Sequence, residues 1–178
     1  MKKNSTKNLV LAGLFIALGI VLPFITGQIP SIGNMLLPMH IPVLIAGFVL
    51  GPKYGLVIGF IVPLLRYMLI GMPPLFPVGI PMAFELATYG FVTGLLYEKL
   101  PKKKSNVFVS LIVAMIVGRI VWGIASFIVF NARQTAFTIE MFMAGAFLNA
   151  IPGIIIQIII IPPIIIALQK NGFIENKN

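Results

Sequence analysis

The chain has 178 residues, of which 59% are hydrophobic and only 10% charged, with a mean hydropathy of +1.07. Because soluble domains carry about 25% charged residues, this composition predicts an integral membrane protein. The chain has no cysteine, one histidine and four acidic residues, which excludes thiol chemistry and leaves too few ligands for an ordinary metal cage or carboxylate dyad. We therefore expect no enzyme, no catalytic residues and no metal site. The formal net charge is +9, and the basic residues cluster at the ends of apolar runs. This placement is typical of residues that set membrane topology, and not of a nucleic-acid-binding surface.

Apolar runs long enough to cross about 30 Å of hydrocarbon recur along the whole length, so residues 1–178 are interpreted as a single membrane domain. The N-terminal run resembles a signal peptide but is followed by no convincing cleavage site, so we take it as a retained helix. Proline, glycine and charge clusters divide the chain into six predicted spans, at 8–26, 36–51, 54–71, 78–97, 106–130 and 140–168. The second is short, and the sixth is long enough to tilt or to kink at Pro152 and Pro162-Pro163. The predicted fold class is an all-α membrane protein with six transmembrane helices.

Lysines set the predicted orientation, because cytoplasmic loops are enriched in Lys and Arg. With six spans, all ten lysines fall on one side: Lys2, Lys3, Lys7, Lys53, Lys99, Lys102, Lys103, Lys104, Lys170 and Lys177. The opposite connections are uncharged except for Arg133 and Glu140. We therefore expect both termini to be cytoplasmic.

Polar residues inside the spans gather, by this topology, between the midplane and the outer side. They are His40, Arg66, Glu85, Tyr89, Arg119, Trp122 and Asn149. Tyr89 follows Glu85 by four residues and Trp122 follows Arg119 by three, so each pair shares a helix face. A charge inside the membrane costs about 2.5–3.5 kcal/mol even on lenient scales, so these groups need partners or water. Their common depth predicts one pocket open to the outside.

Charge balance gives this pocket its predicted ligand. Glu85 compensates only one of the two intramembrane arginines, and the other lacks an acidic partner unless Glu140 reaches it. A net positive pocket suits an anionic ligand, because an arginine fork matches a carboxylate or phosphate. Other interpretations stay open: Arg66 snorkels to the interface, and Arg119 forms a purely structural pair with Glu85.

For the other polar residues, structural and ligand-binding roles stay equally open. His40 either caps backbone groups near Pro38 and Pro42 or contacts the ligand. The aromatic rings of Trp122 and Tyr89 either pack against neighbouring helices or contact the ligand. Asn149 either forms a hydrogen bond between helices or contacts the ligand.

Small residues four apart indicate close helix packing, as in the pairs Gly47 with Gly51, Gly55 with Gly59, and Gly90 with Gly94. The first span, "LVLAGLFIALGIVL", also carries Gly13 and Ala17 and has no strongly polar residue. We expect it to dock another membrane subunit.

These features resemble a known family, the substrate-binding S components of energy-coupling factor (ECF) vitamin transporters. The resemblance covers nearly the full chain and is strongest in "LPMHIPVLIAGFVLGPKYGLVIGFIVPLLRYMLIGMPP", above all in its "GPKYG" turn. In that family an alanine-x-x-x-alanine motif on the first helix meets a transmembrane coupling subunit; the matching positions here are Gly13 and Ala17. The stretches "LLPMHIPVL", "GMPPLFPV" and "MAFELATYG" are most similar to pantothenate-type members.

The resemblance implies a subunit of a bacterial plasma membrane that captures a vitamin or vitamin precursor from outside. Its partners would be the coupling subunit and two cytoplasmic ATPase subunits, which would bind ATP, since this chain has no phosphate-binding loop and no cofactor of its own. Pantothenate is the leading ligand, and a pyridoxine-like or hydroxymethylpyrimidine-like compound stacked on Trp122 is the alternative. Two further alternatives stay open: an ion-coupled secondary transporter that uses Glu85, and a scaffolding protein.

Overall fold

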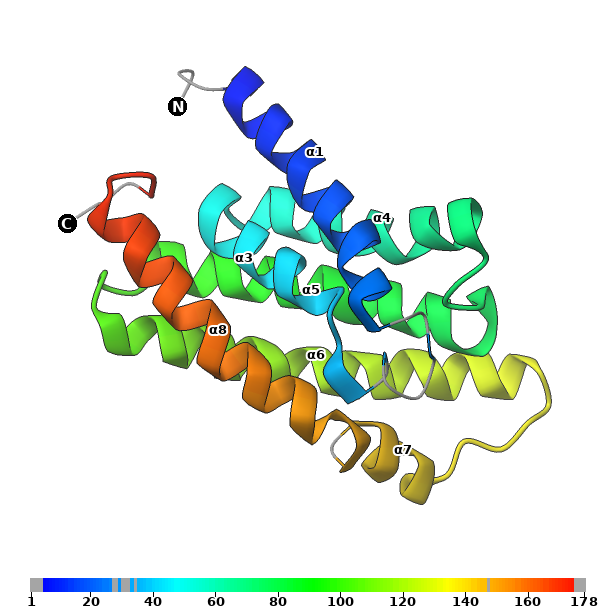
Figure 1. Ribbon diagram of the computed structural model, residues 1–178. Helices are drawn as coiled ribbons and strands as arrows, with labels where there is room; N and C mark the ends of the chain where they lie inside the picture. Colours follow the sequence, from blue (N-terminus) through cyan, green and yellow to red (C-terminus); the bar gives the residue numbers. More distant parts are fainter. Residues whose placement is uncertain (1–4, 27–28, 30–32, 34, 147, 175–178) are drawn as a thin grey trace.

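The computed structural model describes residues 5–26, 29, 33, 35–146 and 148–174, and this part of the chain is helical throughout its length apart from short connections. Figure 1 shows the order of the elements. They are α1 (Ser5–Val21), η1 (Leu22–Thr26), α3 (His40–Leu50), α4 (Pro52–Ile70), η2 (Leu75–Gly79), α5 (Ile80–Lys99), α6 (Lys104–Ala132), α7 (Ile139–Ala146), η3 (Leu148–Ala150) and α8 (Ile151–Lys170).

Five segments of the described chain are long and apolar enough to cross a membrane: Thr6–Ile25, Pro52–Ile70, Leu75–Lys99, Lys104–Ala132 and Ile139–Lys170. A shorter apolar helix, His40–Leu50, accompanies them. The all-α fold class and the six predicted helices are thus confirmed. The multi-pass architecture follows from length and composition, because about 20 apolar residues are needed to span the hydrocarbon core.

Two predicted spans differ from the structure. The second, expected at 36–51, is helical as α3 only from His40, and its 11 residues make it the short helix of the bundle. The sixth, expected as one helix over 140–168, is divided into α7, η3 and α8. The break precedes Pro152, which sits at the start of α8, and α8 continues through Pro162 and Pro163 without ending. Proline is tolerated in the first turn of a helix, so Pro152 begins α8 where a kink inside one helix was expected.

The helices form a layered bundle in which α5 packs against α4, α6 and α3. In Figure 1, α4, α5 and α6 run roughly side by side, while α1 and α8 cross the bundle obliquely. α1 packs on α3 and α4, and α8 packs on α6 and α3. Buried apolar side chains from α1, α3, α4, α5, α6 and α8 form the core. Residues carried on α3, α4, α5 and α6 therefore meet inside the bundle.

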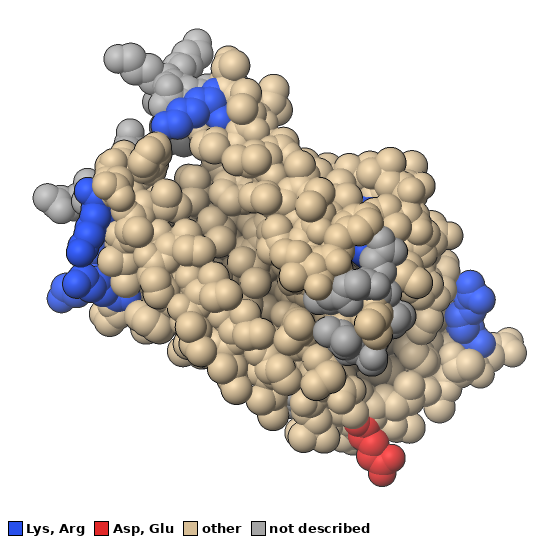
Figure 2. Space-filling view, viewed as in Figure 1, with Lys and Arg blue, Asp and Glu red and all other residues tan. Residues whose placement is uncertain are grey.

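The lysines lie at one end of this bundle. Figure 1 places the start of α1, the α3–α4 turn, the α5–α6 turn and the end of α8 at this same end. These segments carry the described lysines, and Figure 2 shows blue side chains gathered there, with another basic group at the far end. Lys2, Lys3 and Lys177 lie outside the described residues. We call this the lysine end, and the end with the α4–α5 and α6–α7 connections the opposite end.

Glycines bring α4 and α5 into backbone contact. A Cβ atom on Gly90 would lie 2.2 Å from the carbonyl oxygen of Gly55, and a Cβ atom on Gly59 would lie 2.2 Å from the carbonyl oxygen of Leu86. The small-residue spacing predicted this close packing, which only glycine permits at these positions. The "GPKYG" turn follows the same logic, since Gly51 has a φ of +85° and Pro52 begins α4.

We expect Gly90→Leu to destabilise the fold, because overpacking costs about 1–3 kcal/mol and here the obstacle is backbone. Gly13→Leu is the matched control, since a Cβ atom on Gly13 meets nothing within 4 Å. Thermal unfolding of both variants in detergent measures the difference. Equal unfolding temperatures for the two variants would contradict the close α4–α5 packing.

Candidate functional site

The carboxylate of Glu85 is the centre of a buried polar cluster. Its Oε1 atom lies 2.9 Å from Arg119 Nη1 and accepts a hydrogen bond of 2.9 Å from the Tyr89 hydroxyl. Its Oε2 atom lies 3.6 Å from Nε2 of His40. Glu85 and His40 are each 1% exposed and Arg119 is 5% exposed. Four predicted site residues therefore meet around one carboxylate.

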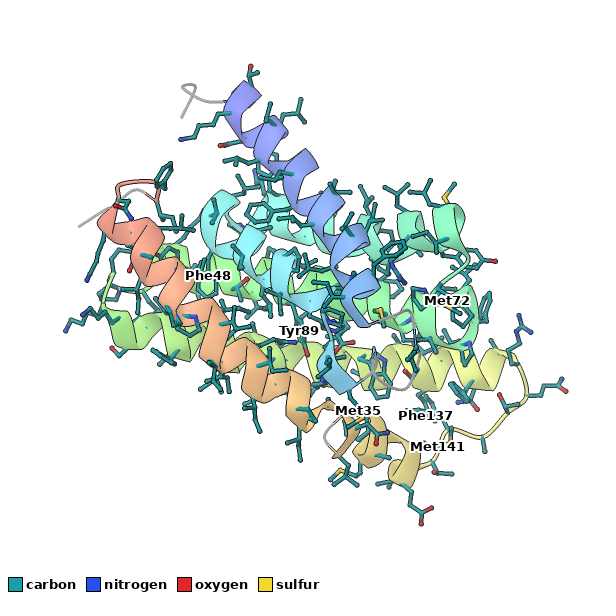
Figure 3. All side chains as sticks on the ribbon, viewed as in Figure 1. Met35, Phe48, Met72, Tyr89, Phe137 and Met141 are labelled. Atoms are coloured by element: carbon teal, nitrogen blue, oxygen red, sulfur yellow. The ribbon has the colours of Figure 1, made fainter. Side chains whose placement is uncertain are left out.

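Helical spacing and packing bring these four residues together. Glu85 and Tyr89 are four residues apart on α5 and point the same way. Arg119 comes from the middle of α6, and His40 is the first residue of α3. The Tyr89 ring lies against Gly118, where an added Cβ atom would overlap it. Glycine before Arg119 thus makes room for the tyrosine that orients Glu85. Figure 3 shows Tyr89 near the middle of the bundle.

Several nitrogen atoms of the cluster lack hydrogen-bond partners among the described residues. They are Nδ1 and Nε2 of His40 and Nε and Nη2 of Arg119. Buried polar groups without partners are costly, so each of these nitrogen atoms carries a free-energy penalty unless another polar group reaches it. In the same part of the chain no three His, Cys, Asp or Glu residues gather at metal-binding distance.

Arg66 is separate from this cluster. Its Nη1 atom donates to the carbonyl oxygen of Met72 at 2.8 Å, and its Nε atom donates to the carbonyl oxygen of Ile20 at 3.4 Å. The guanidinium also lies 5.9 Å from the centre of the Phe24 ring. Among the described residues no carboxylate forms an ion pair with Arg66. Arg66 is nevertheless only 5% exposed.

A cavity of about 290 Å³ lies beside Arg66 and His40. Its remaining lining comes from the end of α1, the residues before α3, the α4–α5 connection and α5: Pro23, Ile29, Gly33, Leu37, Pro38, Met39, Met72, Pro73, Pro74, Val78 and Met82. The volume is close to the lower limit of about 300 Å³ for small-molecule sites. This cavity, which we call the Arg66 cavity, combines apolar walls with one uncompensated cation and one buried imidazole.

Two predicted site residues lie elsewhere. Trp122 stacks on Phe142 and makes an edge contact with Phe137, with ring centres 6.2 and 6.0 Å apart. Figure 3 shows Phe137 near α7 and Met72 at the α4–α5 connection. Asn149 is exposed on η3. The structure thus brings neither Trp122 nor Asn149 into the cluster around Glu85 or the lining of the Arg66 cavity.

Sequence reasoning missed the α4–α5 connection as part of the site. Met72, Pro73 and Pro74 form one wall of the cavity, and the Met72 carbonyl holds Arg66. The available signal was the glycine that ends α4, Gly71, whose φ of +78° returns the chain toward Arg66. Nothing in the sequence indicated the Ile20 carbonyl, because every residue has a backbone carbonyl and none is distinguished by residue type.

The outer face of α1 is apolar and exposed among the described residues. Gly13 and Ala17 are exposed, between the exposed side chains of Val10, Leu14 and Leu18. The opposite face packs inward through Ala12, Phe15 and Gly19. The predicted docking residues therefore lie on the side of α1 that faces away from the bundle.

The fold and the site define a class: a multi-pass helical membrane protein with a polar cluster and a small-molecule-sized cavity inside its bundle. The family model for the substrate-specific component of ECF transporters matches residues 7–165 of the chain. The chain belongs to this family. It is therefore a transport subunit that binds substrate and associates with an ECF module of transmembrane and ATPase subunits, and it is not an enzyme. Comparisons with curated proteins and with solved structures gave no match.

We predict that Arg119→Met alone lowers the free energy of unfolding by about 3–5 kcal/mol, because it leaves Glu85 buried without its cation. Adding Glu85→Gln to Arg119→Met should restore much of this loss, since the uncompensated charge is removed. Chemical or thermal unfolding of the two single variants and the double variant measures the coupling. Strictly additive losses would show that the two residues do not act as a pair.

Proposed function

We propose that this chain captures a small organic anion, a vitamin or vitamin precursor, from the extracellular side and delivers it to ATP-driven uptake. The observation that carries the proposal is the Arg66 cavity, where a buried arginine borders a space of ligand size and has no carboxylate partner in the described part of the chain. An uncompensated buried cation favours an anionic ligand, because pairing the charge offsets its desolvation. The neighbouring cluster of His40, Glu85, Tyr89 and Arg119 would complete the site.

Pantothenate is the leading ligand. It carries one carboxylate for an arginine, and its hydroxyls and amide suit the polar groups near His40. Sequence similarity to pantothenate-type members supports the same choice. A pyridoxine-like or hydroxymethylpyrimidine-like ligand is the alternative. It would need an aromatic stacking partner, and Trp122 is engaged with Phe137 and Phe142.

The lysine end would face the cytoplasm and the Arg66 cavity the outside. Lysine-rich ends are retained in the cytoplasm, and both the start of α1 and the end of α8 belong to the lysine end. The cavity is bordered by the connection between α4 and α5, which belongs to the opposite end. This orientation would open the site toward external substrate.

The exposed face of α1 would dock the transmembrane coupling subunit through Gly13 and Ala17. Small residues allow two helices to approach closely in a membrane, and a Cβ atom on Gly13 would meet no described residue within 4 Å. ATP would be bound by the two cytoplasmic ATPase subunits of the partner module.

Single cysteines test the orientation, since the natural chain has none. In whole cells, we expect a membrane-impermeant maleimide to label Ala136→Cys, which lies in the exposed α6–α7 connection. Lys103→Cys, in the α5–α6 connection, should be labelled only after the membrane is permeabilised. The reverse pattern would place the cavity on the cytoplasmic side.

Reconstitution tests the transport role. In liposomes, we expect the chain alone to bind radiolabelled pantothenate without accumulating it, and to accumulate it when the coupling subunit, both ATPase subunits and ATP are present. Gly13→Leu and Ala17→Leu should preserve binding and abolish accumulation, because a larger side chain blocks close helix approach. Leu9→Ala, a smaller side chain on the exposed surface of α1, is the control and should retain uptake.

Two outcomes would favour the other functions. Accumulation by the chain alone under a proton or sodium gradient would indicate a secondary transporter in which Glu85 couples the ion. Absence of saturable binding for every candidate ligand would indicate a scaffolding role, in which the polar residues only hold helices together.

A further inference from the structure

We infer that the two intramembrane arginines have different tasks, and that together with His40 they select an aliphatic monocarboxylate that carries a neutral hydroxyl or amide group. Arg66 binds the carboxylate, His40 binds the neutral group, and Arg119 contacts neither but positions His40 through Glu85. This assignment rests on the proposed function and specifies the chemistry of its ligand.

Arg66 is the arginine available to an anion. Arg119 already has a carboxylate partner at 2.9 Å, whereas the described residues provide Arg66 with the backbone carbonyls of Met72 and Ile20 and the ring of Phe24 but with no carboxylate. A neutral carbonyl leaves the positive charge of Arg66 uncompensated, and a bound carboxylate supplies the missing charge. Of the two arginines, only Arg66 lines the cavity.

His40 supplies the second polar contact. It lines the cavity, is 1% exposed, and has no hydrogen bond at either ring nitrogen among the described residues. Nε2 faces the Glu85 carboxylate at 3.6 Å, while Nδ1 has no hydrogen-bond partner among the described residues. A hydroxyl or amide group of the ligand can donate to Nδ1 or accept from it, so either group satisfies this nitrogen.

Glu85 and Arg119 act as positioning residues. Arg119 and the Tyr89 hydroxyl both hold Oε1 of Glu85, which leaves Oε2 directed at His40. The cluster therefore fixes the ring of His40 from behind, and neither Glu85 nor Arg119 lines the cavity. Substitution of this pair changes how firmly His40 is held but leaves the charge of Arg66 in place.

The cavity walls favour an aliphatic body between the two polar contacts. Among the described lining residues His40 carries the only aromatic ring, and apart from Arg66 and Gly33 the remaining residues are proline, methionine and branched aliphatic residues. The nearby aromatic cluster of Trp122, Phe137 and Phe142 packs internally. A flat aromatic ligand would therefore lack a stacking surface, while a flexible aliphatic chain fits against methionine and proline.

Pantothenate and pantothenol form a matched pair of probes, because pantothenol has a primary alcohol in place of the carboxylate. We expect the wild-type chain in detergent to bind pantothenate at least about tenfold more tightly than pantothenol or pyridoxine by calorimetry. Arg66→Gln should remove this preference by weakening pantothenate binding to the level of pantothenol. Arg66→Lys, which keeps the charge, should retain part of it.

Two control variants separate charge recognition from positioning. His40→Phe should weaken pantothenate and pantothenol by the same factor, and the Glu85→Gln/Arg119→Gln double variant should also keep their affinity ratio unchanged. The ratio of the affinities for pantothenate and pantothenol reports the carboxylate contact alone. A loss of stability affects the binding of both probes equally, because both bind the same variant.

Opposite results would overturn the assignment. Two results would show that Arg119, and not Arg66, binds the ligand carboxylate. One is an unchanged affinity ratio in Arg66→Gln, and the other is loss of the ratio in the double variant. Tightest binding of pyridoxine would overturn the ligand class while leaving the proposed capture function intact. Mass spectrometry of small molecules released from the purified chain tests the ligand class, since release of an aromatic vitamin would refute an aliphatic ligand. The reconstituted uptake assay tests the transport role independently.

Discussion

The ion pair between Glu85 and Arg119 is the constraint around which the rest of the bundle is organised. A carboxylate and a guanidinium inside an apolar bundle are stable only when they meet, and here they meet at 2.9 Å between α5 and α6. The pair also draws in Tyr89 and faces His40, so four helix positions are tied to one carboxylate. With Glu85 paired to Arg119, Arg66 has no carboxylate partner among the described residues, and we propose that a ligand supplies one.

Close backbone packing makes this arrangement possible. Gly55 and Gly59 of α4 pack against Gly90 and Leu86 of α5, and α5 thereby holds Glu85 inside the bundle. On the other side of α5, the missing side chain of Gly118 leaves room for Tyr89. The polar cluster therefore depends on glycines that carry no chemistry themselves. Membrane helices associate through such packing because lipid offers no hydrophobic driving force between them.

The cavity and the outer face of α1 belong to the same helix–turn segment. Pro23, just beyond α1, lines the cavity, the Ile20 carbonyl accepts from Arg66, and Ala17 and Gly13 lie about one and two turns before Ile20 on the exposed face. For a substrate-specific component of an ECF transporter, this places the proposed ligand site and the proposed docking surface on neighbouring turns of one helix. A rigid helix is a direct physical link between them.

The sequence by itself determined the membrane class, the all-α fold, the number of helices and the polar residues buried inside the bundle around Glu85, because hydropathy, lysine distribution and intramembrane charge are strong local signals. It left open which arginine pairs with Glu85, since both arginines were predicted at depths in the membrane from which they reach Glu85. Residue spacing alone does not determine how each helix is rotated about its axis. Tertiary packing decided that question in favour of Arg119 and placed Arg66 in a cavity with Met72. It also turned Trp122 toward α7 and left Asn149 exposed, because the division of the last span into α7 and α8 depends on long-range packing.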